Sequence, residues 1–253
     1  MHFCRTATRW HYRCLLPASV RRAHRVIVPS QAVCDELRRR YRIAEDRVTV
    51  IVPGVHERFQ RQPQPGELAE LRWRYRLPPR FILFAGCLEP KKNLQRLIAA
   101  FHQARRAGLE GELILVGGRG WGTGLARPRP ADAVRWLGYV PAADLALLYH
   151  LASELAFPAL AEGFGLPVVE AMASGTVVVA SDVPAVEDSD PQAVVSVDPL
   201  AVDDIAEGLL RARQDRALRR RLIARGRRAA ARFSWQRAAE ATWRVYQEIL
   251  ETP

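Results

Sequence analysis

The sequence has only four cysteines in 253 residues, and no two of them are spaced as C-x-x-C. Thiols this sparse exclude a disulfide-rich secreted scaffold, and without closely spaced histidines they exclude a zinc site. The sequence also has no run of about eighteen apolar residues and no apolar segment behind its N-terminal arginines, which excludes a spanning helix and a secretory signal. These absences predict a cytoplasmic chain with free thiols.

Acidic residues are also scarce, since 27 Asp and Glu stand against 38 Lys and Arg, for a net charge of +11. Such an excess admits three kinds of partner: nucleic acid, an anionic membrane surface or an anionic small molecule. No helix-turn-helix, zinc-finger or RNP signature accompanies the charge, so nucleic acid is not expected as a partner.

Much of the excess charge lies in residues 211–232, which include ten arginines. Apolar residues recur there at helical spacing, which predicts an amphipathic helix with its arginines mainly on the outward face. A solvated helix face is the favoured explanation. The alternative is contact with anionic lipid, which would make the protein peripheral on the inner face of the membrane.

From Phe81 onward, short apolar runs alternate with amphipathic stretches, a pattern typical of βαβ units around a parallel sheet. The clearest helix is predicted over residues 94–107 behind Asn93 as its N-cap, and others begin near Ala142, Pro167 and Asp203. Residues 81–232 are therefore predicted to form one complete Rossmann-like domain of the α/β class. Its predicted strands are 81–86, 112–117, 134–137, 154–158, 177–181 and 194–197.

A shorter α/β piece comes first, with strands at 25–28 and 48–52 on either side of a helix from Ser30 to about Arg40. Two strands cannot bury a sheet on both faces, so residues 1–59 are interpreted as the remnant of a larger N-terminal domain. Residues 60–80 are predicted to be a linker and lead-in helix.

Residues 233–253 are predicted to form a final helix, capped by Ser234 and packed back on the N-terminal piece. We expect Trp235, Trp243 and Tyr246 to be left partly exposed.

The stretch EGFGLPVVE, from Glu162 to Glu170, follows a predicted strand. Pro167 suits the first position of a helix, so a glycine-rich loop leads directly into a helix N-terminus at the carboxyl edge of the sheet. Backbone N–H groups and the helix dipole attract anions there, and Gly163 and Gly165 let the backbone approach a ligand or adopt positive φ. Glu162 in the loop and Glu170 in the first helical turn can accept hydrogen bonds from hydroxyls, which predicts a polyol phosphate ligand.

A second anion site is predicted at EPKKN, which precedes the helix at Leu94. Lys91 and Lys92, beside another helix N-terminus, would neutralise a pyrophosphate without a metal. Asp188 and Asp190 form a triplet of the kind that can hold a divalent cation, but they lie in a predicted surface loop, so a structural role is favoured. For Trp121 two explanations stay open: it lines the pocket or it caps a strand end.

Four stretches occur together: residues 86–94 (GCLEPKKNL), 113–117 (LILVG), 137–140 (LGYV) and 162–175 (EGFGLPVVEAMASG). In this order and spacing they resemble group 1 (family 4) glycosyltransferases, and the resemblance covers roughly residues 20 to 250. It implies a GT-B fold and transfer of a mannose-like or glucose-like hexose from a nucleotide diphosphate sugar to a glycan or lipid-linked acceptor. It also implies retention of anomeric configuration, with no metal and no further cofactor.

By the same resemblance, Glu162 contacts the sugar and Lys92 the diphosphate, which makes these two the candidate catalytic residues. Glu170 would hold the nucleotide ribose, and Lys91 is a neighbouring donor-binding candidate. The loop whose amides would face the sugar and phosphates consists of Gly163, Phe164, Gly165 and Leu166.

The resembled family's N-terminal glycine-rich loop and acceptor-side histidine have no counterpart in the sequence. Three hypotheses stay open: one subunit of a split enzyme whose missing half acts in trans, a truncated fragment that at most binds nucleotide, or a basic binding protein that has repurposed the fold.

Overall fold

The computed structural model describes residues 6–120 and 132–251, in two compact units. One unit comprises the chain up to Gly54 together with the residues from Phe233 onward, and the other comprises Val55–Arg232. Among the described residues, no helix is both long and apolar enough to cross a bilayer. Of the described cysteine side chains, Cys34 is buried and Cys87 is exposed, and neither forms a disulfide.

The larger unit is built on a six-stranded parallel sheet with strand order β5-β4-β3-β6-β7-β8. Every residue of β3, β6 and β7 is buried, as expected for strands covered on both faces. The predicted parallel sheet is confirmed, with strand ends shifted by one residue in most cases. The strands are β3 (Phe81–Ala85), β4 (Glu112–Val116), β5 (Val134–Gly138), β6 (Glu154–Phe157), β7 (Val177–Ala180) and β8 (Val195–Ser196).

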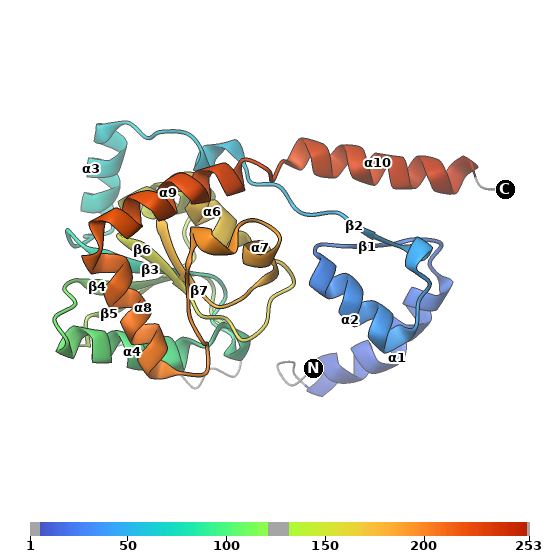
Figure 1. The fold of residues 1–253 in the computed structure, drawn as a ribbon, viewed down its shortest axis with the longest axis horizontal. Helices are drawn as coiled ribbons and strands as arrows, with labels where there is room; N and C mark the ends of the chain where they lie inside the picture. The colour runs from blue at the N-terminus through green and yellow to red at the C-terminus, as the bar shows by residue number, and fades with distance from the viewer. Residues whose placement is uncertain (1–5, 121–131, 252–253) are drawn as a thin grey trace. The chain divides into compact units, whose positions relative to one another are not determined.

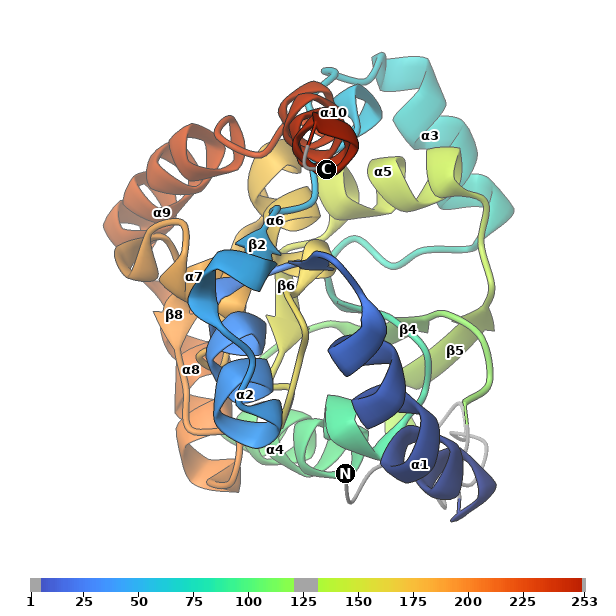
Figure 2. The same ribbon diagram turned by 90° about the vertical axis from the view of Figure 1, so that its right-hand side faces the viewer.

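Helices cover both faces of this sheet (Figure 1). Helices α4 and α8 pack together on one face, and α5, α6 and α9 lie on the other. Figure 2 shows the same two groups of helices from a second direction. The helices of this unit are α3 (Pro65–Arg74), α4 (Leu94–Arg106), α5 (Ala142–Leu151), α6 (Leu166–Ser174), α7 (Pro184–Glu187), α8 (Val202–Gln214) and α9 (Arg216–Ala230).

A buried ion cluster joins β6 to α8 and α9. The Glu154 side chain has no exposed surface, and Arg213 donates to its carboxylate at 2.8 and 3.2 Å. A second cation, Arg219, lies 3.5 Å from the same carboxylate and donates to the carbonyl of Ser153 at 2.8 Å. Burial raises the pKa of Glu154, and the two guanidinium groups oppose that effect. Two arginines within residues 211–232 therefore have a structural role, which was not expected from the prediction that these arginines lie mainly on the outward face of a helix.

The smaller unit contains α1 (Thr6–Arg22), β1 (Val26–Val28), α2 (Gln31–Tyr41), β2 (Val48–Val50) and α10 (Trp235–Glu251). Strands β1 and β2 pair in parallel, and the hydroxyl of Ser30 caps α2 by accepting from the N–H of Val33 at 3.3 Å. The two strands and their helix were predicted from the sequence, whereas α1, which contains Pro17, was not.

Helix α10 has one buried and one exposed side within the smaller unit. Ser234 caps it by accepting from the N–H of Arg237 at 3.4 Å, as predicted. Ala238 and Val245 are buried. The expected exposure of its aromatic residues is observed, since the exposed fractions are 52% for Trp235, 60% for Trp243 and 52% for Tyr246.

Candidate functional site

The candidate site lies at the carboxyl edge of the larger sheet, where the loops after β3 and β6 meet. These strands are neighbours, with Leu83 opposite Leu155, and the strand order reverses between them. Strands β4 and β5 extend the sheet from β3 on one side, and β7 and β8 extend it from β6 on the other. Such a switch point is where open α/β sheets bind their ligands. The N–H of Leu160 donates to the carbonyl of Lys91 at 2.7 Å and so joins the two loops.

Lys92 and Glu162, the two candidate catalytic residues, are in direct contact. Lys92 Nζ lies 2.7 Å from Glu162 Oε1, and the side chains are only 10% and 9% exposed. The ammonium also lies 4.7 Å from the centre of the Phe157 ring. Glu162 Oε1 has no well-aligned hydrogen bond among the described residues, so the contact is chiefly electrostatic. In such a pair the Coulomb attraction is offset by the cost of removing both charges from water, but removing one member leaves an uncompensated buried charge, which is costly.

The 162–166 loop takes its shape from Gly165. This residue has φ of +111° at the N-cap of α6, and a Cβ there would lie 3.1 Å from Val183 Cγ2, so glycine is required. Phe164 is buried beneath the loop, and its carbonyl accepts from the N–H of Ala185 at 2.8 Å. Gly163, the neighbour of Glu162, is exposed, and Leu166 is half-buried. This part of the predicted loop is therefore open to solvent next to Glu162.

Two details predicted for α6 are wrong. The helix begins at Leu166, so Pro167 is its second residue rather than its first. Glu170 is the fifth residue and lies in the second turn, not the first. The reason is that the left-handed Gly165 turns the chain one residue earlier than a proline-based start implies.

Glu170 faces α5 and has a different environment from Glu162. The hydroxyl of the fully buried Tyr149 donates to Glu170 Oε2 at 3.1 Å. Burial raises the pKa of Glu170 to about 7, against a partial lowering by the tyrosine bond. No hydrogen bond or ion pair links Glu170 to Lys92 or Glu162 in the described part of the chain.

The other residues singled out from the sequence lie nearby or in structural roles. Lys91 is 34% exposed and lies 3.9 Å from Glu89 Oε2, so it faces the loop rather than the buried pair. Asp190 is held by Arg225 at 2.8 and 2.9 Å, and this contact lowers the pKa of Asp190. The structural role favoured for Asp190 therefore has a defined partner. Trp121 lies outside the described residues.

Asn93 has a role that was not predicted from the sequence. Asn93 sits at the N-cap position of α4 with φ of +62°, but its side chain makes no capping bond, so the predicted capping role is wrong. Instead its amide donates to the carbonyls of Pro158 at 3.0 Å and Pro199 at 2.6 Å. Asparagine tolerates the left-handed conformation, which is the one local signal that pointed to this loop-joining role.

The sequence is similar to two known glycosyltransferase families. It matches the profile described as "Glycosyl transferases group 1" over residues 70–229 and the profile described as "Glycosyltransferase Family 4" over residues 3–59. The chain belongs to the group 1 glycosyltransferases. The first match includes Lys92, Glu162 and Glu170, so the whole candidate site falls within the part that defines this family.

Two curated relatives are similar to most of the chain. O-antigen chain mannosyltransferase B from Escherichia coli is 34% identical over 190 residues, which cover 72% of this chain and 50% of the relative. A D-inositol 3-phosphate glycosyltransferase from Saccharomonospora viridis is 34% identical over an alignment of 262 positions, which covers 91% of this chain and 57% of the relative. The chain spans about half the length of these relatives.

Solved structures confirm the GT-B fold of this group 1 glycosyltransferase. Anabaena Alr3699/HepE in complex with UDP and glucose gives a TM-score of 0.80 at 20% identity, covering 98% of this chain and 68% of that one. Sucrose-phosphate synthase from Thermosynechococcus elongatus gives a TM-score of 0.79 at 26% identity, covering 98% of this chain and 63% of that one.

The family resemblance predicts that Glu170 accepts hydrogen bonds from the ribose of a nucleoside diphosphate. We expect the affinity for that ligand to rise by roughly fivefold as the pH increases through the Glu170 pKa of about 7, because a carboxylate accepts these bonds more strongly than a carboxylic acid. Isothermal titration at several pH values measures this, and Glu170→Gln should remove the dependence. Glu187→Gln, an exposed acid, is the matched control. Identical pH profiles for the native chain and Glu170→Gln contradict the assignment.

The stability of the fold should change with pH in the opposite direction. The folded-state pKa of Glu170 is raised above its usual 4.5, so between these values the folded chain holds a proton that the unfolded chain has lost. Stability must therefore fall as the pH rises through this window, and Glu170→Gln should lessen that fall.

Proposed function

We propose that the chain binds a nucleoside diphosphate sugar at the carboxyl edge of its larger sheet, and that the protein transfers the hexose to a glycan or lipid-linked acceptor with retention of anomeric configuration. The observation that carries the proposal is the buried contact between Lys92 and Glu162 at the switch point of the sheet. The proposal is also supported by relatives named as a mannosyltransferase and an inositol phosphate glycosyltransferase, and by similar structures in complex with UDP and glucose.

In this proposal Lys92 and Glu162 exchange partners when the donor binds. The ammonium of Lys92 moves from the carboxylate to the diphosphate, where it offsets the negative charge that grows as the bond to the anomeric carbon breaks. Glu162 is then free to accept hydrogen bonds from the sugar hydroxyls, and Glu170 accepts them from the ribose. The amides of the 163–166 loop face the phosphates, and Lys91 adds positive potential at the rim.

The donor site is proposed to work without a divalent cation, because Lys92 and the N-termini of α4 and α6 supply positive charge at the same edge. The second candidate is a nucleotide-sugar-binding chain that transfers sugar only with a second polypeptide. This candidate is supported by three half-exposed aromatic residues on α10, because exposed apolar surface often marks a binding site for a partner. These residues are Trp235, Trp243 and Tyr246.

We expect at least one of UDP, GDP or ADP to increase the free energy of unfolding by RT ln(1 + [L]/Kd), and so to raise the melting temperature of the chain. EDTA and added Mn²⁺ should leave this shift unchanged, and the matching nucleosides without phosphate are the control. If no diphosphate gives a shift at roughly millimolar concentration, the donor site is wrong. A shift that appears only with Mn²⁺ contradicts the metal-free account.

Sugar transfer decides between the two candidate functions. Turnover of a nucleotide sugar into a glycosylated acceptor by the chain alone supports the transferase. Diphosphate binding without turnover, followed by turnover when a second polypeptide is added, supports the split enzyme.

A further inference from the structure

A cavity of about 610 Å³ lies beside the start of β8, between the end of α8 and the length of α9. The donor loops are the loops after β3 and β6, whereas this cavity lies against β8, the last strand of the sheet, with β7 between β8 and β6. No residue of the donor loops lines it. The cavity is therefore separate from the proposed donor site.

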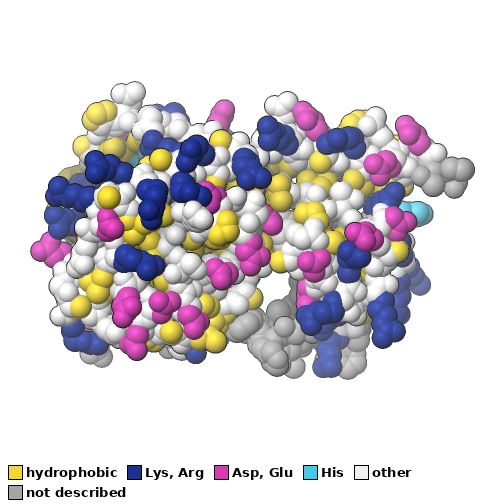
Figure 3. All heavy atoms as spheres, viewed as in Figure 1, with side chains coloured by type: hydrophobic (Ala, Val, Ile, Leu, Met, Phe, Trp, Pro, Cys, Tyr) yellow, Lys and Arg dark blue, Asp and Glu magenta, His cyan; other side chains and the backbone are white. Residues whose placement is uncertain are grey.

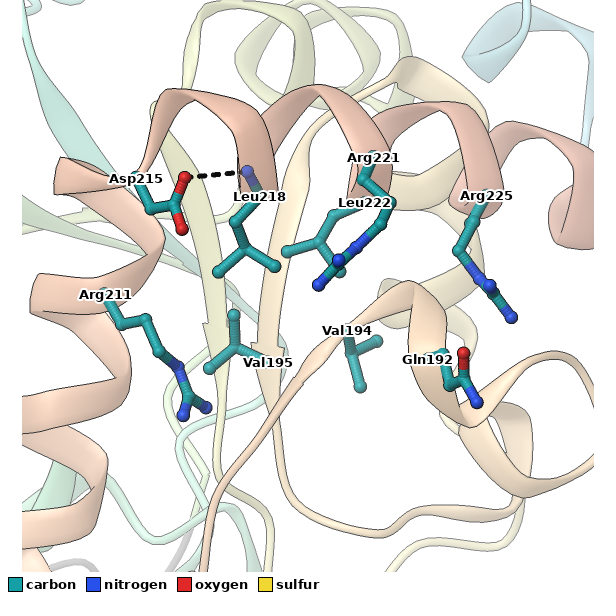
Figure 4. Close-up of a pocket in the computed structure, with 9 residues that line it drawn as sticks. All are labelled: Gln192, Val194, Val195, Arg211, Asp215, Leu218, Arg221, Leu222 and Arg225. Atoms are coloured by element: carbon teal, nitrogen blue, oxygen red, sulfur yellow. Dashed lines mark hydrogen bonds between the residues drawn. The ribbon is translucent and has the colours of Figure 1, made fainter.

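Three arginines line the cavity, and two of them come from different helices and have no carboxylate partner among the described residues. Arg211 comes from the last turn of α8 and Arg221 from the middle of α9, and Figure 4 shows their guanidinium groups on either side of Val195. Both side chains are exposed, and within the described ranges neither forms an ion pair with a carboxylate. Their charge is available to a ligand.

The other charged groups of the cavity already have partners. Arg225 is held by Asp190 at 2.8 and 2.9 Å. The carboxylate of Asp215 accepts from the N–H of Leu218 at 2.8 Å as the N-cap of α9. These contacts leave Arg211 and Arg221 as the pair of cations that a ligand would meet first.

The floor of the cavity is apolar. Val195 and Leu222 are only 2% and 3% exposed, and Leu218 is half-buried beside them. An apolar floor lowers the local dielectric and strengthens the field of guanidinium groups above it. Figure 3 shows Lys and Arg side chains gathered over α9 with apolar surface between them. Electrostatic attraction and an apolar contact surface therefore occur together.

We propose that this cavity binds a phosphate group through Arg211 and Arg221, with the apolar part of the ligand against Leu218. Two guanidinium groups that approach from separate helices suit a tetrahedral anion with several oxygens better than a planar carboxylate, which one guanidinium can satisfy alone. The phosphate can belong to a phospholipid headgroup or to a soluble phosphorylated molecule. This site is additional to the proposed donor site.

The test uses inorganic phosphate as the probe, with binding measured by phosphorus NMR line broadening. Arg211→Ala/Arg221→Ala should weaken phosphate binding by about tenfold or more. Arg216→Ala/Arg220→Ala removes the same charge from exposed positions of α9 outside the cavity and should change it by less than about threefold. Circular dichroism checks that each variant is folded. Since phosphate can also enter the donor site, each pair is also made in a Lys92→Met background, where the difference should persist.

Two results overturn the proposal: unchanged phosphate binding in the cavity variant, or an equal loss in the control, which would mean diffuse charge only. Co-sedimentation with phosphatidylcholine vesicles, with or without phosphatidylglycerol, then identifies the source of the phosphate. A larger loss of vesicle binding in the cavity variant than in the control supports a lipid headgroup. Phosphate binding without vesicle binding supports a soluble ligand.

Discussion

Replacing Lys92 with methionine should weaken binding of a nucleoside diphosphate by about a hundredfold. The change removes the cation that lies 2.7 Å from Glu162 and leaves that carboxylate, only 9% exposed, without its partner. An unpaired carboxylate repels the diphosphate, so the loss should exceed that of one charged hydrogen bond. Titration calorimetry with the diphosphate that stabilises the native chain measures the effect.

Lys91→Met is the matched control, because it removes the same charge from the adjacent position. Lys91 is 34% exposed and lies beside Glu89, so its loss should cost less than about threefold. A second variant, Lys92→Met/Glu162→Gln, removes the stranded carboxylate and should recover any stability lost in Lys92→Met without restoring full affinity. Equal losses for Lys91→Met and Lys92→Met would contradict the assignment of the buried lysine to the diphosphate.

Replacing Arg213 with methionine should lower the free energy of unfolding by about 3 kcal/mol or more. Methionine keeps much of the side-chain volume, but Glu154, which has no exposed surface, would retain only Arg219 at 3.5 Å. Removing one partner of a buried pair leaves an uncompensated charge, which is a large cost. Urea unfolding monitored by circular dichroism measures the change.

Arg211→Met is the control for this experiment, since it lies in the same helix, is exposed and forms no ion pair among the described residues. Its effect should stay within about 0.5 kcal/mol. Combining Arg213→Met with Glu154→Gln should cost less than the sum of the two single changes, because the carboxylate that needs neutralising is gone. A loss of less than about 1 kcal/mol for Arg213→Met would show that the cluster contributes little.

The strands of the larger unit and the position of the donor loops could be predicted from the sequence, because both leave local signals. Buried parallel strands are continuous apolar runs, and a proline after glycines indicates a helix start. Lys92 and Glu162 were assigned by motif, yet their direct contact depends on the pairing of β3 with β6, which no local pattern specifies. Helix α1 left no signal because its apolar spacing is weak and Pro17 interrupts it.

The charge states of the site could not be predicted for a related reason. The pKa of Glu170 depends on burial against α5 and on Tyr149, twenty-one residues earlier in the chain. The arginine-rich segment is a similar case, because helical periodicity shows which side of a helix is polar but not which arginine meets a distant carboxylate. Arg213 and Arg225 contact acids 59 and 35 residues away.

The strand order also has a consequence for how the chain is made. Strands β3, β4 and β5 pair with their sequence neighbours, but β3 meets β6 through residues 82 and 154. On a ribosome, the free edge of β3 therefore waits until β6 has been synthesised, while the β3–β5 half can already pair. Joining the two halves closes the longest loop between paired strands of the sheet. The entropic cost of closing this loop must be compensated by contacts that form afterwards. Glu154 is synthesised 59 residues before Arg213, so a sheet that joined as soon as β6 was available would hold this carboxylate before the arginine that neutralises it.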